Sequence, residues 1–100
     1  MDSLENFRKE IDKIDENLIN LLATRCSICE KVAVYKKAHN IPMMQPERIS
    51  MIIERSIKLG KNYNIPEEFI KEIFTVIINY SCIIEDNIIE ELCKKYDMSI

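Results

Sequence analysis

The sequence predicts an all-α protein of three helices, and three observations carry this prediction. Its 100 residues include a single glycine, Gly60, and three prolines, so few positions interrupt regular structure. Between these positions apolar residues recur at steps of three and four, the spacing of one helix face. The sequence has no β-branched run bounded by turn residues, the pattern typical of strands. The length suits one domain, residues 1–100, with helices expected over about residues 3–38, 46–60 and 65–94.

The first expected helix, residues 3–38, has the most regular pattern. Ser3 is placed to cap its N-terminus. Its apolar seam repeats as in a coiled coil and consists of Leu4, Phe7, Ile11, Ile14, Leu18, Leu21, Ile28, Val32 and Tyr35. At 1.5 Å per residue the helix would be about 50 Å long, too long to lie over one small core. We therefore expect it to reach into a second subunit.

Turn residues set off the second and third expected helices. Pro46 suits the first turn of the second helix, and Gly60 is a natural residue to end it. Pro66 and the two glutamates after it suit the first turn of the third helix. The apolar positions of the third helix are Phe69, Ile70, Ile73, Phe74, Val76, Ile77, Tyr80, Ile83, Ile84, Ile88 and Leu92. Residues 94–100 are expected to fray.

Composition argues against several classes of protein. The formal net charge is −3, with acidic and basic residues interleaved, which disfavours binding to nucleic acid. No apolar run approaches the ~20 residues of a membrane span. The charged start lacks the apolar stretch of a signal peptide, so we expect a cytoplasmic protein.

The cysteines are expected to be reduced thiols without a metal. They are Cys26, Cys29, Cys82 and Cys93. Cys26 and Cys29 have the C-x-x-C spacing, but the sequence lacks the second such pair that would make a zinc site convincing. We expect neither a metal nor a cofactor.

Arg25 is a charged residue at a seam position where the pattern requires an apolar side chain. A buried guanidinium is costly unless it is paired or bound to a ligand. Arg25 could form an interhelical salt bridge, lie with its charge at the edge of the core, or bind an anion in a cavity. Lys36 follows on nearly the same face, about 16 Å further along the axis. The two long side chains could hold one small dianion between them.

Three more polar residues each allow a structural and a functional interpretation. Arg8 lies about 25 Å before Arg25 along the helix, so it is either a solvated surface charge or part of a site in another subunit. Ser81 and Glu85 are four residues apart in a very apolar stretch. Ser81 could simply bond to its own backbone, and Glu85 could begin the polar tail. Alternatively, they bring a hydroxyl and a carboxyl to the wall of a pocket.

The sequence resembles the all-helical chorismate mutase family over roughly residues 4–95. The run FRKEIDKIDENLINLLATR looks like the first-helix signature of that family. A following K-V-A-x-x-K, a loop with proline, P-x-R, L-G and finally I-I-x-x-S also match in order. The resemblance implies a homodimer of three-helix chains whose long first helices cross between subunits. It also implies two pockets, each of which takes one arginine from the partner.

The resemblance assigns a role to each polar residue of the site. The substrate carboxylates would be held by Arg25, Arg48 and Ser81 of one chain and by Arg8 of the partner subunit. Lys36 would hydrogen-bond the ether oxygen whose bond breaks, and Glu85 would be the second group there. The implied activity is the cofactor-free rearrangement of chorismate to prephenate, a step of the shikimate pathway towards aromatic amino acids. Such an enzyme restricts the substrate conformation and stabilises negative charge on the ether oxygen.

The start of the second helix departs from the common D-P-x-R-E pattern of the family. The run here is QPERI, so Gln45 replaces the Asp and Ile49 replaces the Glu that binds the ring 4-hydroxyl. An apolar residue would leave a buried hydroxyl unpaired, although Gln45 could still bind it. Locally the run resembles isochorismate-pyruvate lyases, and a 4-amino-4-deoxychorismate mutase is a third possibility. Two other classes stay open: a non-catalytic module that binds a dicarboxylate, and a structural dimer without a pocket.

Overall fold

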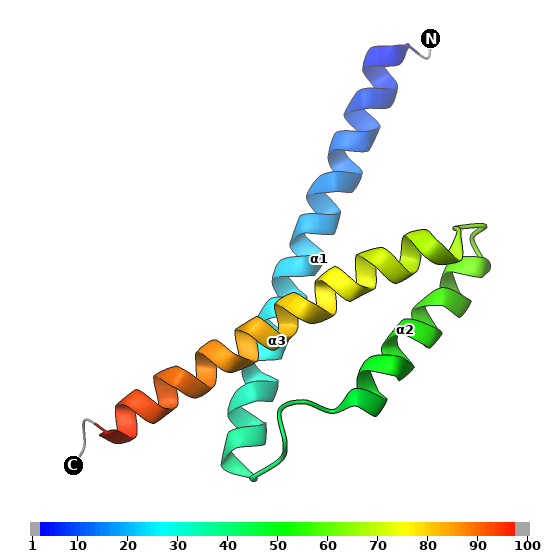
Figure 1. Cartoon of the computed structure of the whole chain (residues 1–100). Coiled ribbons are helices and arrows are strands. Elements are labelled where there is room, and N and C mark those ends of the chain that lie inside the picture. The colour runs from blue at the N-terminus through cyan, green and yellow to red at the C-terminus, as the bar shows by residue number, and fades with distance from the viewer. Residues whose placement is uncertain (1–2, 98–100) are drawn as a thin grey trace.

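The computed structural model describes residues 3–97 and contains three helices (Figure 1). They are α1 (Leu4–Ala38), α2 (Pro46–Lys61) and α3 (Glu67–Asp97). The expected three-helix, all-α architecture is confirmed, and the described residues include no strand. Residues 94–97 were expected to fray but continue α3, since no glycine or proline follows Pro66 to end the helix. The rest of that expected frayed end, residues 98–100, lies outside the described residues.

The two ends of α1 are stabilised locally. The Ser3 hydroxyl accepts a hydrogen bond from the Asn6 backbone N–H at 3.2 Å, as predicted for an N-terminal cap. Lys36 and Lys37 lie in the last turn, where positive charge is favourable to the helix dipole. Asn40 follows in the left-handed conformation, with a φ of 55°, and reverses the chain after α1. These local interactions stabilise the ends of α1, including the N-terminal end, which lies beyond the contacts with α3.

Gly60 does not end α2 as predicted, because the helix continues to Lys61. Gly60 is buried, and a Cβ built on it would lie 2.8 Å from Cγ1 of Ile70 on α3. The missing side chain therefore allows α2 and α3 to approach closely. The hairpin is closed by a hydrogen bond at 3.0 Å from the Ile65 N–H to the Gly60 carbonyl.

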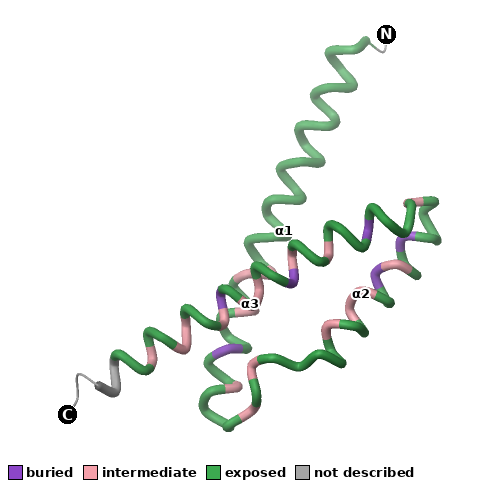
Figure 2. The backbone as a smooth tube through the Cα atoms, viewed as in Figure 1, coloured by how far each residue is buried: buried purple, intermediate pink, exposed green. Residues whose placement is uncertain are grey.

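α3 packs against α1 near the middle of both helices and against α2 along its first half (Figure 1). Buried residues are few and lie where α3 meets its neighbours (Figure 2). Among the described residues they are Ala33, Ser56, Gly60, Ile70, Ile78 and Ile84. The crossing of α1 and α3, together with the start of α2, forms a part of the described chain in which all three helices line one cavity.

The N-terminal half of α1 projects away from the other two helices (Figure 1). The radius of gyration is 18.1 Å, against about 13 Å for a compact domain of this length. Phe7, Ile11 and Ile14 of the predicted seam are 49%, 54% and 58% exposed. A second exposed apolar row on α3 consists of Phe69, Ile73, Val76, Tyr80 and Ile83. Within residues 3–97, no helix is long and apolar enough to cross a membrane.

Candidate active site

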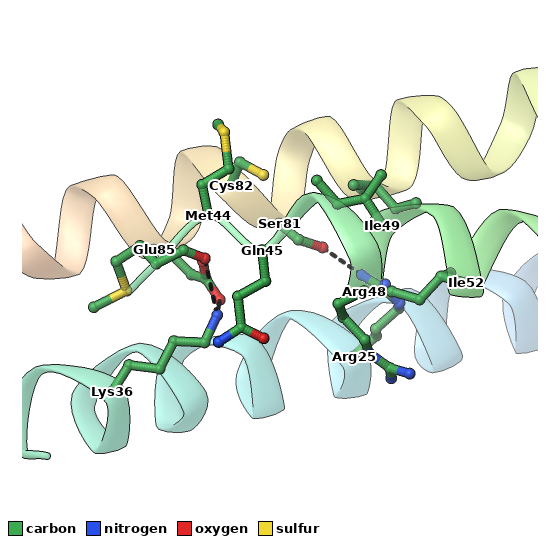
Figure 3. A pocket seen from close by; sticks show the side chains of 12 residues that line it. Arg25, Lys36, Met44, Gln45, Arg48, Ile49, Ile52, Ser81, Cys82 and Glu85 are labelled. Carbon is green, nitrogen blue, oxygen red and sulfur yellow. Dashed lines mark hydrogen bonds and ion pairs between the residues drawn. The ribbon is translucent and has the colours of Figure 1, made fainter. Parts of the chain in front are cut away.

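A cavity of about 90 Å³ lies between the second half of α1, the start of α2 and the middle of α3 (Figure 3). Seven of the residues predicted for the site line it together: Arg25, Lys36, Gln45, Arg48, Ile49, Ser81 and Glu85. Arg8, the eighth, is not among them, because it lies on the projecting half of α1 and is exposed. The α1–α3 crossing and the α1–α2 loop thus bring residues up to sixty positions apart to one place.

Arg25 is half-buried on α1 and donates a hydrogen bond from Nη1 to the hydroxyl oxygen of Ser81 on α3 (Figure 3). Ser81 in turn donates to the carbonyl of Ile77, one turn earlier, at 3.0 Å. In the described part of the chain Arg25 pairs with no carboxylate, and its contact with α3 is to a hydroxyl instead. A partly buried guanidinium held by neutral groups is available to bind an anion.

Lys36 and Glu85 form an ion pair across the cavity, with 3.1 Å between Nζ and Oε1. Their side chains are only 16% and 12% exposed, so this pair is less screened by water than a surface pair. Lys36 also donates to the carbonyl of Met43 at 3.0 Å, which ties the α1–α2 loop to the site. An ammonium has three N–H donors, and these two contacts leave the third free to meet a ligand.

The start of α2 supplies the remaining wall of the cavity. Gln45 donates from Nε2 to the carbonyl of Pro42 at 3.4 Å, which holds the end of the loop against itself. Arg48 is exposed and adds a second guanidinium to the lining. Ile49 contributes an apolar side chain beside it. An anion between the two guanidinium groups would relieve their mutual repulsion.

The charge of the lining is strongly positive. Arg25, Lys36 and Arg48 provide three positive charges, and Glu85 provides the one negative charge. The net charge of about +2 suits a small dianion. Within residues 3–97, no cluster of histidine, cysteine or acidic side chains is arranged to hold a metal ion.

Several residues of the site were missed by sequence reasoning. The other lining residues are Met43, Met44, Ile52, Ile78 and Cys82. Ile52 and Ile78 each lie three residues from a predicted site residue, so helical spacing contained the signal. The two methionines lie on an irregular loop, where no periodicity indicates which way a side chain points. Cys29 was expected only to be a reduced thiol without a metal, although it follows Arg25 by one helical turn.

Comparison with known proteins gives a consistent family assignment. The model of the family described as chorismate mutase type II matches residues 7–86. A chorismate mutase from Methanocaldococcus jannaschii is 34% identical over 95 residues, which cover 95% of this chain and 96% of that protein. A 4-amino-4-deoxychorismate mutase from Streptomyces venezuelae is 32% identical, with coverage of 83% and 81%.

A bifunctional chorismate mutase/prephenate dehydratase from Buchnera aphidicola is 34% identical over 92% of this chain, which corresponds to 24% of that protein. The shorter relatives thus match over most of their length, and the longer one matches in a part of its chain. The match of the family model over most of the chain, on an all-helical fold, shows that this protein belongs to the chorismate mutase type II family.

Proposed function

We propose that this protein is a chorismate mutase that converts chorismate to prephenate. The observation that carries the proposal is the convergence of Arg25, Lys36, Arg48, Ser81 and Glu85 on one cavity, in a chain of this family. Chorismate carries two carboxylates, which match the net charge of about +2 in the lining. The free cysteines of the chain suit a reducing compartment, and we propose a cytoplasmic location.

The proposed mechanism uses binding and electrostatics alone. In the rearrangement one carbon–carbon bond forms as the ether carbon–oxygen bond breaks, and neither protons nor electrons are exchanged with the protein. Arg25, Arg48 and Ser81 hold the carboxylates and keep the enolpyruvyl arm over the ring. The free N–H of Lys36 points to the ether oxygen and stabilises the negative charge that develops there. Glu85, when protonated, donates a second hydrogen bond to the same oxygen.

We infer that the active form is a homodimer whose long α1 helices cross. Support comes from the exposed apolar seam of α1, which a second copy would cover, and from the exposed row on α3. Arg8 lies on the same projecting half of α1, about 25 Å along the axis from Arg25. It is therefore too far to serve the cavity of its own chain. The partner subunit's Arg8 would complete the anion site.

A second candidate substrate is 4-amino-4-deoxychorismate, because two Streptomyces relatives are named as mutases of that compound. Gln45 and Ile49 stand where the family pattern has acidic residues, so these two positions do not determine whether the substrate ring carries a hydroxyl or an amino group. An amino group on the ring is protonated at neutral pH and requires a nearby carboxylate. Glu85 is the one carboxylate in the lining, and Lys36 already engages it. The charge distribution therefore favours chorismate.

The proposal is tested by giving the purified protein three substrates separately: chorismate, 4-amino-4-deoxychorismate and isochorismate. We expect prephenate from chorismate, with the highest kcat/KM of the three. Salicylate and pyruvate from isochorismate would instead identify a lyase, the alternative suggested by the P-E-R-I run. Binding of chorismate without turnover of any substrate would identify a binding module and refute the proposed enzyme.

A further inference from the structure

Cys29 lies beside the guanidinium of Arg25 and the hydroxyl of Ser81, two groups at one end of the cavity. It follows Arg25 by one turn of α1 and is half-buried. Its Sγ is 3.8 Å from Nη1 of Arg25 and 3.5 Å from the hydroxyl oxygen of Ser81. Both distances are within the range of the weak hydrogen bonds that a thiol makes as acceptor and as donor. The thiol therefore joins the guanidinium on α1 to the hydroxyl on α3.

In the free protein the hydroxyl of Ser81 has a complete set of partners. A hydroxyl has one proton and two lone pairs. The proton of Ser81 is donated to the carbonyl of Ile77, and the lone pairs accept from Arg25 and from the thiol of Cys29. In this arrangement Ser81 has no proton left for a ligand. Ser81 can therefore donate to a bound carboxylate only if its proton turns away from the carbonyl of Ile77.

The change that a carboxylate causes follows from the strengths of the bonds. A guanidinium binds a carboxylate more strongly than a neutral hydroxyl, so where the carboxylate takes the Nη1 donor of Arg25, Ser81 loses that partner. The Ser81 proton then leaves the carbonyl of Ile77 and is donated to the same carboxylate. The oxygen of Ser81 keeps one partner, the S–H of Cys29. That bond holds the hydroxyl in the orientation in which it faces the ligand.

We propose that Cys29 is a positioning residue, which orients Ser81 and Arg25 towards a substrate carboxylate. The proposal rests on the proposed function, because it requires a carboxylate ligand. Cys29 acts at the end of the cavity opposite the Lys36–Glu85 pair, as Figure 3 shows for its partners Arg25 and Ser81. Its effect therefore falls on binding of the substrate and leaves the chemical step at the ether oxygen unchanged.

The test compares C29A, C29S and C26A with the wild type in steady-state kinetics with chorismate. Cys26 is the matched control: it is a half-buried thiol on α1 that lines a separate, largely apolar cavity, to which Arg25 and Ser81 also contribute. Within residues 3–97, the thiol that hydrogen-bonds with Arg25 and Ser81 is that of Cys29, not that of Cys26. We expect C29A to raise KM roughly three- to tenfold and to change kcat less than about twofold. C29S, which keeps a donor and an acceptor, should restore KM, and C26A should match the wild type.

The outcomes separate the role of Cys29 from simple packing. An unchanged KM in C29A overturns the proposal, and so does a rise of equal size in C29A and C29S. An equal rise of KM in C26A would mean that any cavity along α1 weakens binding, and this result would also overturn the proposal. Absence of turnover in the wild type would refute the proposed function together with this role. If the wild type converts chorismate and C29A has the same KM, only the role of Cys29 is refuted and the proposed function stands.

Discussion

At the scale of the residue, the ammonium of Lys36 is the group to which the proposed mechanism assigns the stabilisation of the ether oxygen. Two of its donors are fixed by Glu85 and the carbonyl of Met43, so its position is held from α3 and from the loop. A charge that is already in place needs no reorganisation when negative charge develops on a ligand. Lys37, its neighbour on α1, is exposed and offers a control with the same chemistry.

Replacement of this ammonium should therefore slow the reaction itself. We expect Lys36→Ala to lower kcat about a hundredfold to a thousandfold, because the charge on the ether oxygen loses its main stabilisation. Lys37→Ala should leave kcat and KM unchanged. Steady-state kinetics with chorismate measure both variants. A loss confined to KM in Lys36→Ala would show that this residue only binds the substrate.

Glu85 should contribute a hydrogen bond to the ether oxygen in the proposed mechanism. A carboxyl group donates such a bond in its protonated form, and the amide of a glutamine is always a donor. We expect Glu85→Gln to retain kcat and Glu85→Ala, which removes the donor, to lower it. Steady-state kinetics with chorismate measure both variants. Equal kcat values for Glu85→Ala and the wild type would show that Glu85 does not donate to the substrate.

Ile49 should influence the choice between a ring hydroxyl and a ring ammonium. A carboxylate at this position of the cavity wall would offer an ammonium the partner that the present lining lacks. We expect Ile49→Glu to raise the ratio of kcat/KM for 4-amino-4-deoxychorismate to that for chorismate by about tenfold. The two substrates are measured with both proteins. An unchanged ratio would exclude Ile49 from the ring subsite.

The charged residues of the site were predicted from sequence more readily than their partners. Arg25 stands out because it interrupts an apolar seam, which is a local property of the sequence. Its actual partner, the hydroxyl of Ser81, depends on how α1 crosses α3. Spacing within one helix does not determine that crossing, so neither the contact of Arg25 with Ser81 nor the contacts of Cys29 could be predicted from sequence. The contact of Lys36 with the loop carbonyl of Met43 was missed for the same reason.

At the scale of the element, α1 carries an apolar seam that its own chain leaves exposed. Isolated helices in water gain most of their stability from packing of such a face. The helices themselves were predictable, since the recurrence of apolar residues and the start signals at Ser3 and Pro46 are local. Gly60 was misassigned because glycine serves equally to end a helix and to admit a neighbouring helix.

Charge placed on this seam should dissociate the proposed dimer. We expect Ile14→Glu to give a monomer with little activity, because a carboxylate would replace an apolar contact between subunits. Lys13→Glu introduces the same side chain at the adjacent position outside the seam and should remain a dimer with normal kcat. Sedimentation velocity gives the masses. A dimeric and active Ile14→Glu would mean that the N-terminal half of α1 is not an interface.

At the scale of the whole molecule, the extended shape could be predicted from the sequence only in part. The length of α1 predicted a helix that outgrows a single core, and the 68 Å long dimension of the chain agrees with it. The angle at which α3 crosses α1 was not predictable, because each helix presents apolar residues over a wide arc. That crossing decides which residues reach the cavity and which remain exposed for a partner.

We propose that each active site is shared between protomers, with Arg25 from one and Arg8 from the other. The most direct measurement mixes two variants, Arg8→Ala and Arg25→Ala, each nearly inactive alone, after mild denaturation and refolding together. A mixed dimer then has one intact site and one site that lacks both arginines. We expect the mixture to recover about a quarter of the wild-type activity, because half of the dimers are mixed at random pairing. A mixture that stays as inactive as its components would contradict the shared site.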